Sequence, residues 1–275
     1  MEAVVITGLA QGIGREVAKL LARSKVPVAG FDVDADGIES LKQELEAAGC
    51  DHLLMTLDIT DRAGILRFRD AVLEKFGRVD VVLSNVGIGF FGPFEEVDLE
   101  KAAKCMEINV IGTAAIFQAF LPSMRENGSG RLIAVSSLVG QIPFPFESIY
   151  SASKFAVEGL VQSMRYEVEP FGIRVALIEP AQVSTTFAAK IHKLPPEGSP
   201  YRERAGRFIK RDEELIKTAP TPPQAAREIV KVIKSRKPKL YNQVDPKSKV
   251  FLALNKVLPR SIRDEILLRQ MDIRP

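Results

Sequence analysis

The chain has 275 residues, of which 46% are hydrophobic and 27% are charged, a composition typical of a folded globular protein with a large core. Its net charge of +3 is too small to indicate a nucleic-acid-binding protein, and two cysteines, Cys50 and Cys105, are too few for a disulfide framework. No secretory signal and no apolar run of about 20 residues is apparent, so we expect a cytoplasmic protein.

Short apolar runs alternate along the chain with amphipathic segments of helical length. Runs of valine, isoleucine and leucine between helices predict a parallel sheet that is covered on both faces. We therefore predict an α/β fold, a doubly wound parallel sheet (Rossmann fold), in a single domain over residues 1–275. The predicted strands are residues 3–8, 26–32, 52–58, 79–85, 130–137, 173–180 and 239–244.

A glycine-rich turn directly follows the first predicted strand and precedes a helix. It reads TGLAQGIG from Thr7 to Gly14. Such a turn lets backbone N–H groups approach a pyrophosphate at a helix N-terminus, although a simple helix-capping turn is the alternative. The candidate cofactor-binding residues of this turn are Gly8, Gln11, Gly12, Ile13 and Gly14.

Asp32 ends the second predicted strand, 18 residues after Gly14. An acidic residue there can bind a ribose 2′-hydroxyl and repels a 2′-phosphate. Val33 supplies no adjacent cation, so we predict a preference for NAD(H), with NADP(H) as the alternative. Arg15 is the residue that could reverse this preference.

Residues 149–154 read IYSASK, in which Tyr150 precedes Lys154 by four positions. On a helix these positions share a face, so the phenol and the ammonium group are expected to be neighbours. The pairing could lower the pKa of the phenol for proton transfer, or it could belong to an ordinary amphipathic surface. The spacing alone does not decide between them.

Taken together, the motifs resemble those of the short-chain dehydrogenase/reductase family, in order and spacing over residues 3–186. They are the glycine turn, Asn85-x-Gly87, Asn109, Ser137 and the Tyr150/Lys154 pair. Two departures are Val86, where the family usually has alanine, and Ala181, where it usually has glycine. Both add bulk near the expected cofactor.

The resemblance implies catalytic roles for four residues. Tyr150 would be the general acid for carbonyl reduction and the base for alcohol oxidation, with its pKa brought down by about 3 units, or roughly 4 kcal/mol, by Lys154 and the positive nicotinamide. Lys154 would also hold the nicotinamide ribose. Ser137 would hydrogen-bond the substrate oxygen, and Asn109 would position a water in a proton relay.

The resemblance also extends the predicted cofactor site. Asp58 and Ile59 would line the adenine, and Asn85 and Gly87 would lie behind the cofactor. Further along, the segment that begins at Pro180 would bring Val183 and Thr185 to the carboxamide. No metal site is predicted, because the two cysteines and two histidines are scattered.

Two aromatic segments are expected to face the substrate, together with a substrate-loop region at residues 187–221. The segments carry Phe90, Phe91, Phe94, Phe144 and Phe146. These rings favour a lipophilic secondary alcohol or ketone of steroid, retinoid or long-chain type. Core packing is the alternative for any one of them.

Residues 245–275 are predicted to form a C-terminal helical tail, which loosely resembles that of steroid- and retinol-type members. Between residues 227 and 249 the chain carries eight basic residues and two acidic ones, Glu228 and Asp245: Arg227, Lys231, Lys234, Arg236, Lys237, Lys239, Lys247 and Lys249. This region could contact an anionic membrane peripherally, or it could be a solvated helix with a dimer-covering tail.

We therefore predict an NAD(H)-dependent oxidoreductase that acts on a small lipophilic substrate and forms a homodimer or homotetramer, as relatives commonly do. The alternatives are an NADP(H)-dependent carbonyl reductase and, from another class, a non-catalytic dinucleotide-sensing or scaffold protein. Nucleotide-sugar epimerases share Tyr-x-x-x-Lys, but they usually have a different glycine spacing and a larger C-terminal domain.

Overall fold

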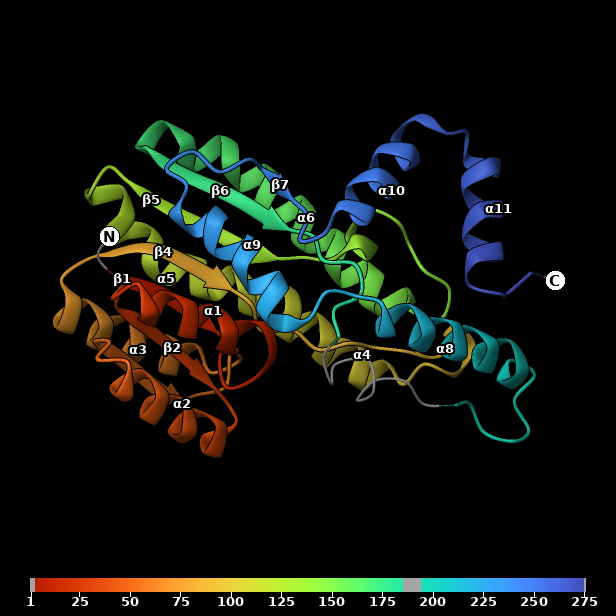
Figure 1. Cartoon of the computed structure of the whole chain (residues 1–275), viewed down its shortest axis with the longest axis horizontal. Coiled ribbons are helices and arrows are strands. Elements are labelled where there is room, and N and C mark those ends of the chain that lie inside the picture. The colour runs from red at the N-terminus through yellow and green to blue at the C-terminus, as the bar shows by residue number, and fades with distance from the viewer. Residues whose placement is uncertain (1–2, 185–193, 275) are drawn as a thin grey trace.

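The computed structural model describes residues 3–184 and 194–274. Within them, one parallel sheet runs through the molecule with helices on both of its faces (Figure 1). Its seven strands lie in the order β3-β2-β1-β4-β5-β6-β7. They are β1 (Ala3–Thr7), β2 (Val28–Asp32), β3 (His52–Thr56), β4 (Val79–Ser84), β5 (Gly130–Val135), β6 (Ile173–Ile178) and β7 (Tyr241–Asn242).

Each segment predicted to be a strand contributes one to the sheet, which confirms the fold class. The strand order reverses at β1, with β2 on one side and β4 on the other. In open α/β sheets, the loops after two such strands part and leave a ligand-binding crevice at their carboxyl ends. Here those two loops are the glycine turn after β1 and the segment that begins at Asn85 after β4.

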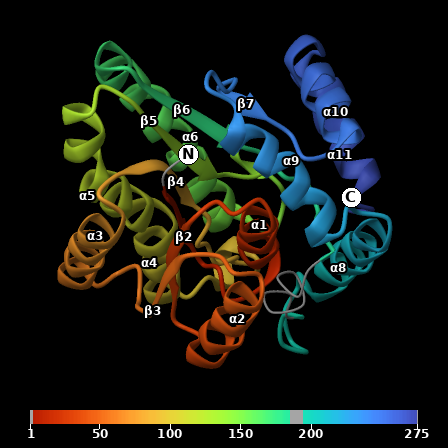
Figure 2. The same ribbon diagram turned by 60° about the vertical axis from the view of Figure 1, so that its left-hand side comes forward.

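Each face of the sheet has its own helical layer and core (Figure 2). Leu21, Leu41 and Ile229 are fully buried on one face, and Phe68, Phe120 and Val161 are fully buried on the other. These two cores fix the strand ends from which the site is built. The first layer is α1 (Gly12–Arg23), α2 (Ala35–Ala47) and α9 (Pro222–Lys234), and the second is α3 (Arg62–Phe76), α5 (Gly112–Glu126) and α6 (Ser148–Val168).

Between β4 and β5, one helical stretch spans residues 99–126. It consists of α4 (Leu99–Met106), a π-helical turn η2 (Glu107–Ile111) and α5. Among the described residues it is the one helix long and apolar enough to cross a membrane, and half of its most apolar window is buried. A core helix meets the same criterion. From the sequence we expected no apolar segment of membrane-spanning length, and that expectation was too strict. Charged residues interrupt the apolar run, but they do not end the helix.

The region predicted to be a substrate loop contains a helix, α8 (Arg202–Lys217). Its buried residues, Ala205, Phe208 and Asp212, recur at helical spacing, but one of them is acidic and most of the others in α8 are charged. Because of this composition, the sequence shows no clear apolar pattern at helical spacing here. Residues 187–193 of the predicted loop lie outside the described part of the chain.

The C-terminal tail contains α10 (Pro246–Val257) and α11 (Arg260–Gln270). They stand beside α8 and α6, away from the N-terminal half of the sheet (Figure 1). A third apolar cluster joins them to the site, because Leu252 of α10 and Met271 share it with Leu138 and Phe144, which follow β5. The short 3-10 turns are η1 (Phe94–Glu96), η3 (Leu138–Gly140) and η4 (Glu169–Phe171).

Candidate active site

The glycine turn is closed by close backbone packing at the N-terminus of α1. Gly8 and Gly12 have φ values of +70° and +60°, a region that favours glycine. A Cβ on Gly14 would lie 2.3 Å from the carbonyl oxygen of Gly8. The Asn85 side-chain amide donates to the carbonyl of Gly8 at 2.8 Å and so braces the turn from the loop after β4. This narrow cradle at a helix N-terminus fits a pyrophosphate.

Asp32 is buried at the end of β2, where its carboxylate accepts the backbone N–H groups of Ala10 at 3.0 Å and Asp34 at 3.1 Å. Arg15 points elsewhere. Its guanidinium donates to the Ala10 and Gly37 carbonyls at 2.8 and 3.0 Å and pairs with Glu44 at 2.8 Å. Arg15, the residue that could have reversed the predicted preference for NAD(H), is therefore held by the glycine turn and α2.

A single cleft of about 1020 Å³ runs from the glycine turn to the start of α6. Most of the predicted site residues line it. Gly14 and Asn109 do not, because each lies behind the wall, and Thr185 lies outside the described residues. The predicted residues in the wall are Gly8, Gln11, Gly12, Ile13, Asp32, Asp58, Ile59, Asn85, Gly87, Ser137, Tyr150, Lys154, Pro180 and Val183.

Asn109 is buried in the π-helical turn η2, and its side chain joins three elements. Its Oδ1 accepts the N–H of Ile88 at 2.8 Å, while its Nδ2 donates to the carbonyl of Ile88 at 2.9 Å and to the Ser153 hydroxyl at 3.0 Å. The amide is thus committed to the segment after β4 and to α6. Local π-helical turns are frequent at functional sites.

Ser137, Tyr150 and Lys154 meet at the start of α6. The Tyr150 hydroxyl and the Ser137 side chain share a hydrogen bond. Lys154 Nζ donates to the carbonyl of Val135 at 2.9 Å and lies 5.7 Å from the centroid of the Tyr150 ring. The end of β5 therefore holds the ammonium group near the phenol, as the i, i+4 spacing predicted.

The electrostatics of this group differ from the sequence-based expectation. Burial, and then the Glu147 carboxylate, raise the pKa of Tyr150, while the hydrogen bond with Ser137 opposes this rise. Burial also lowers the pKa of Lys154 to about 8. The chain's own groups thus favour the protonated phenol, because desolvation outweighs the hydrogen bond with Ser137.

Several polar residues in the wall had not been predicted, among them Glu147, Asp212 and Gln182. Glu147 and Asp212 are buried carboxylates that line the cleft with Tyr150, and Gln182 donates to Asp212 at 2.9 Å. In the sequence, Glu147 looks like the flank of a helix and Asp212 belongs to a run of charged residues. Only the fold brings α8 to the start of α6, so no local pattern could have paired them.

The aromatic prediction was largely wrong in detail. Of the five phenylalanines, only Phe144 lines the cleft. The rings of Phe91 and Phe146 pack against Phe208 of α8, with centroids 5.6 and 5.8 Å away, and Phe94 is exposed. Phe91 and Phe146, which the sequence assigned to the substrate, thus pack against α8 instead.

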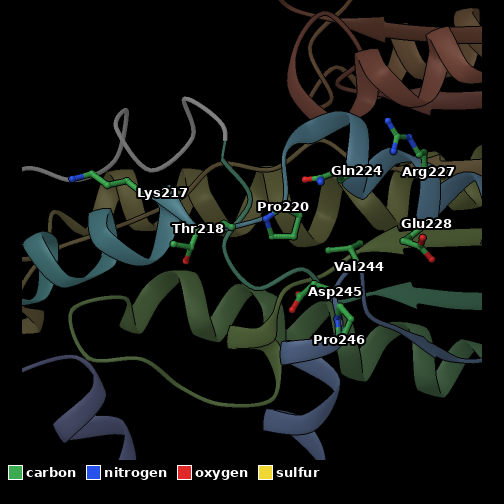
Figure 3. Close-up of a pocket in the computed structure, with 10 residues that line it drawn as sticks. Lys217, Thr218, Pro220, Gln224, Arg227, Glu228, Val244, Asp245 and Pro246 are labelled. Atoms are coloured by element: carbon green, nitrogen blue, oxygen red, sulfur yellow. The ribbon is translucent and has the colours of Figure 1, made fainter.

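A second, more open hollow of about 500 Å³ lies between the end of α8, α9 and the start of α10 (Figure 3). Charged residues of both signs and prolines line it, and it contains none of the predicted site residues. Its lining includes Lys217, Pro220, Arg227, Glu228, Asp245 and Pro246. The chemistry-bearing residues therefore gather in the larger cleft.

Comparisons with known proteins agree on one family. A family model described as short chain dehydrogenase matches residues 2–195. Human 17-beta-hydroxysteroid dehydrogenase type 1 is 37% identical over 203 residues, which is 70% of this chain but only 60% of that protein. The chain thus matches less than two thirds of the length of this relative.

Two further matches cover almost the whole chain. A 3-ketodihydrosphingosine reductase from Bacteroides thetaiotaomicron is 29% identical over 255 residues, which is 92% of this chain and 91% of that protein. A solved short-chain dehydrogenase/reductase from Burkholderia phymatum, in complex with NAD, superposes with a TM-score of 0.81 at 25% identity, covering 93% of this chain and 92% of that one.

Proposed function

Because the chain belongs to the short-chain dehydrogenase family, we propose that it is an oxidoreductase that transfers a hydride between NAD(H) and a lipophilic secondary alcohol or ketone. One observation carries this proposal: a single cleft is lined both by the glycine turn after β1 and by Ser137, Tyr150 and Lys154. The first part suits a dinucleotide, and the second suits proton transfer to an oxygen.

The cofactor is a nicotinamide dinucleotide, and its chemistry when bound is to give or accept the hydride. The glycine turn, Asp32, Asp58, Ile59, Gly87, Pro180 and Val183 are the proposed cofactor-binding residues of the cleft wall, together with Thr185. The buried carboxylate of Asp32 and the engagement of Arg15 with Glu44 support NAD(H) over NADP(H).

Tyr150 is the proposed general acid and base. Since burial raises the pKa of its phenol, Tyr150 keeps its proton at neutral pH and can give it to a carbonyl oxygen that Ser137 also binds. In the reverse direction, Tyr150 must first lose that proton, which the nearby Lys154 ammonium favours. Asn109 acts as a positioning residue, because it ties the segment after β4 to Ser153 on α6.

A lipophilic substrate is supported by the cleft wall beyond Ser137, where Leu138, Val139 and Phe144 join the third apolar cluster. The names of the two relatives, one a steroid enzyme and the other a dihydrosphingosine enzyme, support the same class. We propose residues 187–221 as the substrate-loop region, with α8 as its described part.

Further partners follow from the same proposal. We propose a cytoplasmic homodimer or homotetramer with peripheral membrane contact through the C-terminal region. Exposed apolar residues on α10, namely Val250, Leu254 and Val257, support such contact.

The experiment that tests the function is turnover of NADH or NADPH with a panel of lipophilic ketones, and of NAD with the corresponding alcohols. We expect Tyr150→Phe to lower kcat by at least about a hundredfold, because loss of a general acid typically costs that much, and to bind the cofactor as the wild type does. Normal turnover by this variant would refute the acid/base assignment. Cofactor binding without turnover by the wild type, across the panel, would favour the sensing or scaffold alternative.

A further inference from the structure

The segment that follows α11 folds back as a hydrogen-bonded turn. The N–H of Ile273 donates to the Leu268 carbonyl at 3.0 Å, and the N–H of Asp272 donates to the Arg269 carbonyl at 3.3 Å. These two bonds form a Schellman motif, in which glycine usually occupies the position of Asp272. Asp272 has a φ of +55° and an exposed side chain. A residue with a side chain persists in this conformation only where its surroundings hold it there.

Three arginines of α8 supply such surroundings, because they bind this turn by its backbone. They recur at i, i+3 and i+7 and therefore share one face of α8. Each donates to a carbonyl at the end of α11 or in the turn, where a helix leaves its carbonyls without partners. The pairs are Arg204 with Ile273 at 2.7 Å, Arg207 with Asp272 at 3.0 Å, and Arg211 with Gln270 at 2.9 Å. Figures 1 and 2 both show the C-terminal end of the chain beside α8.

The neighbouring face of α8 belongs to the substrate end of the cleft. Asp212 and Ile216 line the cleft, and Phe208 is fully buried in the third apolar cluster. Met271 and Ile273 are buried in the same cluster, at 0% and 1% exposure, together with residues of the cleft wall after β5. The turn thus contacts α8 twice, through the arginines and through the cluster, and fixes where α8 stands at the cleft.

On the basis of the proposed oxidoreductase function, we propose that residues 270–273 are a positioning element for the substrate, which hold α8 against the cleft and thereby determine the preference for long lipophilic substrates over short ones. If α8 moved away, the apolar end of the cleft would widen and make fewer contacts with an alkyl chain. Each methylene that the site buries contributes roughly fourfold to binding, so losing two or three of them costs tenfold or more. The glycine turn lies at the other end of the cleft, so NADH binding does not depend on this contact.

The φ of Asp272 allows a test that leaves every buried side chain in place. Asp272→Val puts a β-branched residue where the backbone needs a positive φ, which such residues rarely adopt, and should detach the turn. We expect the ratio of kcat/KM for a long-chain over a short-chain ketone to fall at least about tenfold, through a higher KM for the long-chain ketone. The affinity for NADH should stay at the wild-type value. Asp272→Gly adopts the same φ without strain and should keep the wild-type ratio.

A second variant reaches the same contact from α8. Arg204→Gln/Arg207→Gln removes two of the three donors and should lower the ratio as Asp272→Val does. Lys210→Gln, an exposed cation on α8, controls for the loss of charge and should keep the ratio.

Lys25→Val is the matched control for backbone strain. Lys25 is exposed and has the same φ of +55°, but it lies just after α1. Its ammonium group also donates to the Ala48 carbonyl at 2.5 Å, so this variant should lose at least as much thermal stability as Asp272→Val. It should nevertheless keep the wild-type ratio of kcat/KM values.

The outcomes separate this inference from the proposed function. If Asp272→Val and the arginine variant both keep the wild-type ratio, residues 270–273 do not position α8 for the substrate. If Lys25→Val lowers the ratio as much as Asp272→Val, general destabilisation explains the loss and the inference is wrong. A wild type that reduces the short-chain ketone as well as the long-chain one would also refute it, while the proposed hydride transfer would stand. Absence of turnover across a wider panel of ketones, with either NADH or NADPH, would instead count against the proposed function itself.

Discussion

The proposed preference for NAD(H) depends on the carboxylate of Asp32. It points into the cleft at the end of β2, where it would repel a 2′-phosphate. We expect Asp32→Ala to lower the ratio of kcat/KM for NADH over NADPH by at least about tenfold, because like-charge repulsion in a partly buried site is worth a few kcal/mol. Initial rates with the two cofactors measure this ratio.

Two controls separate charge from structure at this position. Asp32→Asn keeps an acceptor for the Ala10 N–H and should relax the preference to a similar extent. Asp36→Ala removes an exposed carboxylate in the first turn of α2 and should leave the preference unchanged. A wild type that already prefers NADPH would show that the assignment of Asp32 is wrong.

Glu147 gives a second prediction, on stability. Burial, and then the charge of Asp212, raise its pKa from 4.5 to about 8 on folding, so the folded protein holds a proton that the unfolded chain releases. This contribution is fully present below pH 4.5 and is lost as pH rises toward about 8. Relative to wild type, Glu147→Gln should therefore gain about 1.4 kcal/mol in unfolding free energy per pH unit across this window.

Urea unfolding at a series of pH values measures this difference. Glu213→Gln, on the exposed side of α8, is measured in parallel as the control variant. If the difference between Glu147→Gln and the wild type did not change with pH, the pKa of Glu147 would not be raised on folding. A residue retained at a cost in stability is typical of a functional site.

Single residues also mark the limit of prediction from sequence. Tyr150, Lys154 and Ser137 lie in motifs whose spacing is local, so the sequence brings them together before any fold is known. The Glu147/Asp212 pair is separated by 65 positions, and neither residue lies in a recognisable motif. Their proximity depends on how α8 docks onto the start of α6, which long-range packing decides.

At the scale of elements, the turn between β1 and α1 is the most constrained part of the site. A Cβ on Gly14 would lie 2.3 Å from the Gly8 oxygen and 2.7 Å from the Asn85 amide nitrogen. Gly14→Ala must therefore move α1 away from the turn and break the Asn85 brace. We expect NADH affinity, measured by fluorescence titration, to fall at least about tenfold, since the cradle needs close backbone approach.

Gly77→Ala is the control for this variant. Unlike Gly14, Gly77 has a positive φ, +68°, and an added Cβ there would meet no atom within 4 Å. The control should lose about 1 kcal/mol of stability through backbone strain and bind NADH normally. Equal losses of affinity in both variants would show that general destabilisation, and not the turn, weakens binding.

The elements themselves were predictable to different degrees. Strands β1 to β6 are short apolar runs bounded by polar residues, and their pattern depends only on burial within the sheet. The helix α8 was missed because one of its three buried positions is Asp212 and its other faces are charged. The π-helical turn around Asn109 has no sequence signature, since tertiary contacts with Ile88 and Ser153 accompany it.

At the scale of the whole molecule, the C-terminal helices connect the cleft with an exposed apolar surface. The inner side of α10 contributes Leu252 to the apolar cluster that includes Phe144 of the cleft wall. Its outer side exposes Val250, Leu254 and Val257, which recur at i, i+4 and i+7 on one helical face. A lipid surface that covered this face would therefore contact α10, the helix whose other side packs against the cleft wall where the lipophilic substrate is proposed to bind.

This arrangement predicts binding to vesicles that contain anionic phospholipid. Basic residues such as Lys249 and Arg260 flank the exposed apolar face of α10, so binding should weaken with added salt and be lower on neutral vesicles. We expect the double variant Leu254→Glu/Val257→Glu to reduce co-sedimentation at least about tenfold. Each change removes apolar area that the membrane would bury and adds a negative charge that the anionic lipid repels.

The matched control is Leu66→Glu on α3, since Leu66 and Leu254 are equally exposed at 46% but lie on different parts of the molecule. Leu66→Glu should co-sediment as the wild type does. If it weakened binding as much as the α10 variant, the attraction would be a general property of the surface. If the wild type did not bind anionic vesicles at low salt, the apolar face of α10 would have to be covered by another partner, and a concentration-dependent dimer would then be the outcome to measure.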